Sequence, residues 1–193
     1  MSAHIVTNTG VDNRKFAMWT LIGSECFLFG TLITNYMINR HRSVGGPTGP
    51  EIFDINLTTL STFDLLISSV AMAMAVYYCK HKKLRAMQWS LAAVLLFGLF
   101  FLGFQWYEFH HFLSLGLGLS TNIFGASFYI LTGCHGAHVA VGCLIIGTLL
   151  VRSLIQGEKW FDYDVVETCG LYWHFVDVIW IIIFTVVYLF VYI

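Results

Sequence analysis

Several ionisable side chains stand inside apolar runs long enough to cross a bilayer. Glu25, in WTLIGSECFLFG, is about nine residues inside the first run and so roughly 13 Å deep, near the midplane. A charge there costs several kcal/mol, so Glu25 is expected to be protonated or partnered. It is a candidate for proton handling or subunit contact, and the alternative is a structural hydrogen bond to a neighbouring helix.

Two histidines, His135 and His138, lie three residues apart in TGCHGAHVAVG and share one helix face. This spacing is compatible with a metal or haem site. The small residues around them, such as Gly133 and Gly136, instead favour close helix approach. We therefore expect both histidines to form hydrogen bonds to a facing helix.

The last apolar run contains LYWHFVDVIWIII, with His174 and Asp177 in its inner half. The spacing predicts a hydrogen bond between these two residues, or partners on other helices, with the polar stripe turned away from lipid. Asp177→Leu is then expected to weaken the fold or its retention in a complex. Trp19, Trp173 and Trp180 are candidates for contact with lipid or another subunit.

A third set of polar side chains lies at the end of another apolar run, in FQWYEFHHFL. Gln105, Glu108 and His111 are three residues apart and are expected to share one face near the outer interface. His110 and His111 point about 100° apart on a helix, so they chelate one ion poorly. Glu108 is the proton-handling or structural candidate of this group.

Two further acids and the cysteines have simpler interpretations. Asp64 is expected to be structural, near the interface or hydrogen-bonded across helices, and Glu167 to be solvated at the inner surface. The five cysteines include no CxxC pair, which disfavours a disulfide framework or a thiolate metal site.

The elements that position these residues must lie in a membrane. The chain is 58% hydrophobic and only 11% charged, whereas a soluble domain has about 25% charged residues. We predict an all-α, polytopic protein forming a single domain over 1–193. Its five transmembrane helices are predicted at about 16–38, 57–79, 87–110, 122–150 and 170–193.

Charge predicts the topology. The polar N-terminus shows no signal peptide, so the first run is expected to remain as an anchor. With the N-terminus in the cytoplasm, the inner segments hold eight lysines and arginines and the outer segments two, so the C-terminus is expected outside. The net charge of −1 gives no sign of a nucleic-acid surface.

Four stretches together resemble subunit III of haem–copper respiratory oxidases: WTLIGSECFLFG, WYEFHHFL, FGASFYILTGCHGAHVAVG and LYWHFVDVIWIIIFTVVYL. They come in the family's order and spacing and cover nearly the whole chain. The positions that match family motifs are Glu25, Glu108, His135, His138, Glu167, Trp173, His174 and Asp177.

The resemblance implies a core subunit of a proton-pumping terminal oxidase, which passes electrons from cytochrome c to O2 in a bacterial cell membrane. Such a subunit has no catalytic residue, haem or copper of its own. The haem and copper belong to partner subunits. The subunit packs on subunit I in a complex that also contains subunit II, binds phospholipid, and supports proton uptake. Membership of a larger respiratory supercomplex is compatible with this.

One departure from the family concerns the number of spans. Many members have seven, and this chain resembles the last five, without the pair that helps to form a lipid-holding cleft. Short forms also occur in quinol oxidases, which remain the alternative, and a nitric-oxide reductase accessory protein is a more distant one. The competing classes are a haem- or metal-binding membrane enzyme and a transporter or proton channel built around Glu25 and Asp177.

Overall fold

A computed structural model describes residues 13–42, 47, 53–157 and 161–190, and all the regular elements in these ranges are helices. In chain order they are α1 (Asn13–Asn39), α3 (Ile55–Lys80), α4 (Leu84–Ser114), α5 (Ile123–Gln156), α6 (Tyr163–Phe184) and the π-helical stretch η2 (Thr185–Leu189), which continues α6. Five helices, with η2 counted in the last, are long and apolar enough to cross a membrane. The prediction of an all-α protein with five spans is confirmed.

The helix starts follow from local capping. Asp54, Asn122 and Asp162 precede α3, α5 and α6, and each side chain accepts a hydrogen bond from a backbone N–H of the first turn. Lys83, before α4, makes no such bond. Gly157 ends α5 with φ 57°, a conformation that glycine adopts without strain. The cap at Asp162 starts the last helix well before the predicted span.

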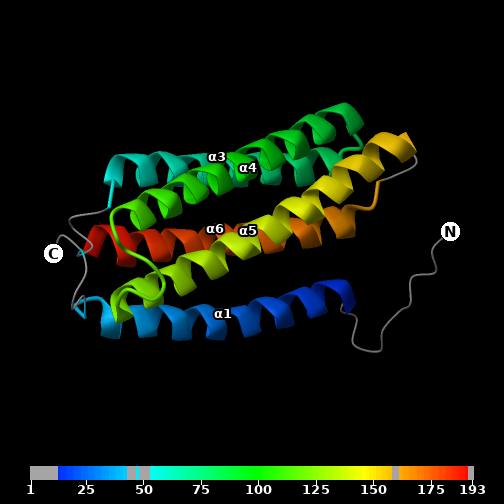
Figure 1. Cartoon of the computed structure of the whole chain (residues 1–193). Coiled ribbons are helices and arrows are strands. Elements are labelled where there is room, and N and C mark those ends of the chain that lie inside the picture. The colour runs from blue at the N-terminus through cyan, green and yellow to red at the C-terminus, as the bar shows by residue number, and fades with distance from the viewer. Residues whose placement is uncertain (1–12, 43–46, 48–52, 158–160, 191–193) are drawn as a thin grey trace.

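The helices form a bundle in which α5 and α6 separate the α3–α4 hairpin from α1 (Figure 1). In the most apolar window of each span, 56% of the residues are buried in the last helix and 6% in α1. The last helix is thus the centre of the bundle, and α1 packs by one face only. We call the two ends of the bundle the α3–α4 end and the α4–α5 end, after the turns they carry.

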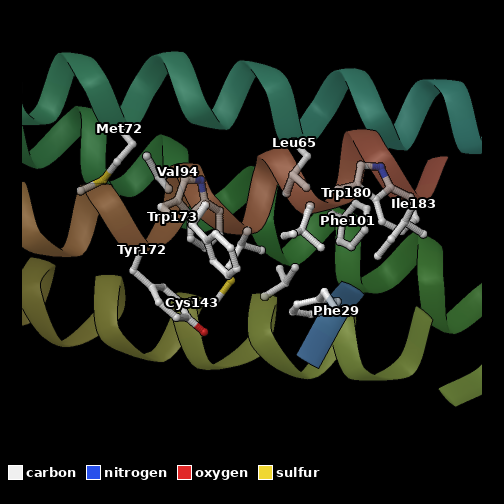
Figure 2. Close-up of a cluster of buried hydrophobic side chains, with 14 of the residues drawn as sticks. Phe29, Leu65, Met72, Val94, Phe101, Cys143, Tyr172, Trp173, Trp180 and Ile183 are labelled. Atoms are coloured by element: carbon white, nitrogen blue, oxygen red, sulfur yellow. The ribbon is translucent and has the colours of Figure 1, made fainter. Parts of the chain in front are cut away.

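The core is built around Trp173, whose side chain is fully buried among residues of four helices (Figure 2). Its indole N–H donates to Ser68 Oγ of α3 at 3.0 Å. Its ring lies so close to Gly98 of α4 and Gly142 of α5 that a Cβ at either position would stand 2.8 Å from a ring carbon. Two glycines therefore create the space that the indole fills.

Trp180 occupies a similar position two turns further along α6. It is 2% exposed, its indole N–H donates to Thr62 Oγ1 at 3.0 Å, and its ring packs edge-on against Phe101 at 4.7 Å. The prediction that Trp173 and Trp180 contact lipid or another subunit is wrong, because both lie inside the chain. Trp19 on α1 is 60% exposed and is available for such a contact.

Candidate functional site

The central polar layer is a set of side chains that lie near the middle of four different helices. Its members are Glu25 of α1, Ser69 of α3, His135 and His138 of α5, and His174 and Asp177 of α6. Because the spans run side by side, these groups share nearly the same depth in the bilayer. Their partners determine what the layer does.

Glu25 is joined to His138. The Glu25 Oε2 and His138 Nε2 atoms are 3.1 Å apart, and both side chains are about one-fifth exposed, at 20% and 19%. His138 Nδ1 lies 2.8 Å from the carbonyl oxygen of Cys134, so Nδ1 must carry a hydrogen. One proton is therefore shared between Glu25 and Nε2, giving either a neutral acid and imidazole or a carboxylate and imidazolium. The expectation that Glu25 is partnered or protonated is confirmed.

His135 bonds in a different direction. It is fully buried, its Nε2 donates to the Val176 carbonyl oxygen of α6 at 3.2 Å, and its ring lies 4.8 Å from that of Trp180. His138 reaches α1 instead, so the two histidines do not converge. Both make the interhelical hydrogen bonds that the small residues around them predicted. Among the described residues, no three His, Cys, Asp or Glu side chains come together as metal ligands would.

His174 and Asp177 do not bond to each other. His174 Nδ1 lies 2.7 Å from the hydroxyl oxygen of Ser69 on α3. The Asp177 side chain is 3% exposed, and neither carboxyl oxygen has a hydrogen-bond partner within the described residues. The Ser69 side chain lies near the Asp177 carboxyl group, but the two groups do not have the geometry of a hydrogen bond. The predicted His–Asp bond is wrong, and the alternative of a partner on another helix holds for His174.

Glu108 ties three elements together at the α4–α5 end. It is 8% exposed and accepts hydrogen bonds from Thr58 of α3 at 2.9 Å and from Tyr188 of η2 at 3.1 Å. Gln105, one turn earlier, donates to a backbone carbonyl of α5 at 2.6 Å. His111 is exposed, so the expectation that it shares their face is wrong. Three residues are less than one turn, and by His111 the face has rotated out of the core.

Ion pairs join α1 to the start of α6 at the α3–α4 end. Lys15 Nζ lies 2.5 Å from Glu167 Oε2 and 3.8 Å from Asp164, and Arg14 lies 3.1 Å from Asp162. The expectation that Glu167 is simply solvated is therefore wrong. Sequence reasoning missed these pairs, although opposite charges at the same end of two predicted spans were a signal for them.

Asp64 is placed differently from the other acids. It is half-buried on α3 and makes no hydrogen bond or ion pair with any residue that the structure describes. At about 1.5 Å per residue it lies roughly 14 Å along α3 from the start of the helix. No hydrogen bond across the described helices satisfies it, and its position relative to the membrane interface stays a prediction.

These features define an integral membrane protein whose polar residues connect its own helices. The sequence profile of the cytochrome c oxidase subunit III family matches residues 4–192. The chain belongs to this family, which confirms the resemblance of its four motifs.

Relatives carry two names. Cytochrome c oxidase subunit 3 of Bacillus subtilis is 38% identical over 178 residues, which are 92% of this chain and 86% of that protein. A probable quinol oxidase subunit 3 of Staphylococcus haemolyticus is 37% identical over 191 residues, which are 95% of this chain and 94% of that one. A probable quinol oxidase subunit 3 of Staphylococcus epidermidis is 36% identical over 177 residues, 91% and 88% of the two chains. Together with the five helices, these relatives identify a multi-pass protein of a bacterial cell membrane.

Proposed function

We propose that this chain is the core subunit of a proton-pumping terminal oxidase that binds no haem or copper itself and stabilises subunit I. The observation that carries the proposal is how the histidines in the middle of the spans are used. His135, His138 and His174 each bond to a different helix of this chain, to α6, α1 and α3. A subunit built in this way holds its shape in the bilayer, and the haem and copper that reduce O2 belong to its partners.

Purification from the native membrane through a tag on this chain tests the proposal. Visible spectra and metal contents are recorded before and after this chain is stripped from its partners. The expected result is that haem and copper co-purify and remain with the partners. Haem or metal that stays with this chain alone would overturn the proposal and make the histidines ligands.

The proposal also names the electron donor of the complex. The motifs favour cytochrome c as donor, and relatives with cytochrome c and with quinol oxidase names are about equally similar. The donor enters through other subunits, so the purified complex is assayed with reduced cytochrome c and with a quinol. Faster turnover with the quinol would identify the alternative, a quinol oxidase subunit III.

We also propose that the Glu25–His138 pair supports proton uptake, because it shares one proton at mid-membrane and is partly accessible from outside the chain. Glu25→Gln is expected to leave assembly largely intact and to change proton uptake or the lifetime of the enzyme during turnover. Glu108→Gln, at the α4–α5 end, is measured in parallel, and an equal change there would mean that the effect is not specific to the Glu25–His138 pair. If uptake and lifetime are unchanged in Glu25→Gln, Glu25 is only structural.

We infer from the Asp64 side chain, which is unpartnered among the described residues, that another oxidase subunit contacts α3. A carboxyl group inside the hydrocarbon layer needs a hydrogen-bond donor, and the described part of this chain offers none. Its neighbours one turn away, Leu60 and Ile67, are 54% and 50% exposed. A photoreactive residue at Ile67 is expected to cross-link to a partner subunit, and one at Leu144 on α5 to lipid. Cross-links to lipid alone at Ile67 would contradict this placement.

The topology is proposed from charge. Among the described residues, the α3–α4 end carries Arg14, Lys15, Arg152 and the cations of its turn, whereas the opposite end carries Arg40 and Arg42. The positive-inside rule then places the α3–α4 end in the cytoplasm. Labelling of single cysteines at the two ends of intact cells tests this orientation, and reaction of the α3–α4 turn with an impermeant reagent would reverse it.

A further inference from the structure

The turn between α3 and α4 is the most strongly cationic segment that the structure describes. Four lysine and arginine side chains and one histidine fall within six residues, and all five are exposed. They are Lys80, His81, Lys82, Lys83 and Arg85. Topology alone does not require such a concentration, because Arg14, Lys15 and Arg152 at the same end already bias the orientation.

Most of these charges are not balanced within the described part of the chain, since only Lys80 is attracted by a described carboxylate, Glu167, and then beyond ion-pair distance. None of the four lysine and arginine side chains of the turn forms an ion pair with a described residue. The carboxylates at this end, Asp162, Asp164 and Glu167, lie within 4 Å of Arg14 or Lys15 instead. The cationic turn is therefore available to an anion from outside.

The backbone adds to the positive charge. α4 begins after Lys83 with no side-chain acceptor on its first turn, and Arg85 is its second residue. The N-terminus of a helix carries a partial positive charge, which lysine and arginine side chains increase. α3, α5 and α6 instead begin with acidic or amide caps.

Two aromatic side chains locate the turn relative to the bilayer. Tyr77, in the last turn of α3, is 54% exposed, and its ring lies 4.2 Å from that of His81. Trp89, in the second turn of α4, is 78% exposed. Exposed tyrosine and tryptophan at the ends of membrane helices lie at the level of lipid head groups. The cations between them stand where a phospholipid phosphate is found.

We propose that the α3–α4 turn binds the head group of an anionic phospholipid, with Lys82, Lys83 and Arg85 facing the phosphate and Trp89 beside the upper part of the acyl chains. Clusters of lysine and arginine next to a membrane helix recognise anionic lipids through charge. Each such residue strengthens binding by about fivefold. The inference needs only that the chain is inserted in a membrane, so it stands or falls independently of the oxidase function.

The test uses the complete complex, stripped of lipid in detergent and titrated with phosphatidylglycerol or phosphatidylcholine while bound lipid is counted by native mass spectrometry. The variant is Lys82→Gln, Lys83→Gln and Arg85→Gln combined. The matched control is Arg40→Gln with Arg42→Gln at the opposite end. We expect the variant to lose about a hundredfold in affinity for phosphatidylglycerol, from fivefold for each of three cations. The control and all phosphatidylcholine affinities are expected to stay the same.

Two further measurements keep the result interpretable. Lys82→Arg with Lys83→Arg keeps the charge and is expected to keep the affinity, even if the triple variant assembles poorly. A photoreactive residue in place of Trp89 is expected to cross-link to phosphatidylglycerol. The proposal would be overturned if the triple variant bound phosphatidylglycerol as tightly as the unchanged protein, or if the control pair lost as much affinity as the triple variant. It would also be overturned if inorganic phosphate bound as tightly as phosphatidylglycerol, or if position 89 cross-linked only to a partner subunit.

Discussion

The tight contact between Gly142 and the Trp173 ring gives a sharp stability prediction. A methyl group at Gly142 would stand 2.8 Å from Trp173 Cζ3 and 2.9 Å from Cε3, whereas carbon atoms pack best at about 3.5–4.0 Å. The ring cannot easily move, because it is fully buried and its N–H is bonded to Ser68. Overpacking of this kind costs about 1–3 kcal/mol.

Gly147→Ala is the matched control. Gly147 lies on the same helix, and a methyl group there meets nothing within 4 Å. Both substitutions gain about 1 kcal/mol of helix propensity, so this gain cancels when the two variants are compared. Gly142→Ala should therefore be less stable than Gly147→Ala by about 1–3 kcal/mol.

Thermal unfolding of the purified protein in one detergent measures the difference. At about 2–4 °C per kcal/mol for a chain of this size, Gly142→Ala should melt several degrees below Gly147→Ala. Trp173→Phe removes both contacting ring carbons, so Gly142→Ala should cost less in that background, with a coupling of about 0.5–3 kcal/mol. Equal melting of the two glycine variants, or an unchanged cost of Gly142→Ala in the Trp173→Phe background, would refute the packing explanation.

Three more substitutions follow from the polar contacts. Tyr188→Phe removes one of the hydrogen bonds to buried Glu108 and should cost about 1–3 kcal/mol in the free energy of unfolding; an unchanged melting temperature would contradict that bond. Lys15→Met breaks a partly exposed ion pair with Glu167, so it should cost at most about 1 kcal/mol, and less in high salt; a larger loss in high salt would count against an ionic origin. Asp177→Leu removes a buried carboxyl without a hydrogen bond, so its melting temperature should stay or rise, and a fall would show an energetically important partner.

The sequence predicted the spans and the bonding of His135 and His138 well, and for a physical reason. Apolar runs of bilayer length have few structural alternatives in lipid. Small residues beside a polar group indicate a helix interface, and both histidines bond across one, although only Gly136 is tightly packed there and Gly133 faces open space. The partnered state of Glu25 was predictable because an isolated charge at that depth is too costly.

The positions of Trp173 and Trp180 could not be predicted in the same way. In a membrane span, aromatic residues suit both lipid and core, so their type does not identify their face. The last helix is central only because of how the other helices assemble around it. The same limit applies to Asp177, for which the sequence indicated a stabilising bond and the structure reverses the expected sign of Asp177→Leu.

The bond between Glu25 and His138 has a consequence for biosynthesis. The two residues are 113 positions apart, and α1 packs on α5 and α6, which are made last. At about 5–20 residues per second, Glu25 waits for roughly 6–23 s after its own synthesis before its partner has been made. During that interval the first helix must hold an acid inside or beside the membrane without His138. Insertion of the nascent chain is therefore a stage at which this helix depends on protonation of Glu25 or on help from the insertion machinery.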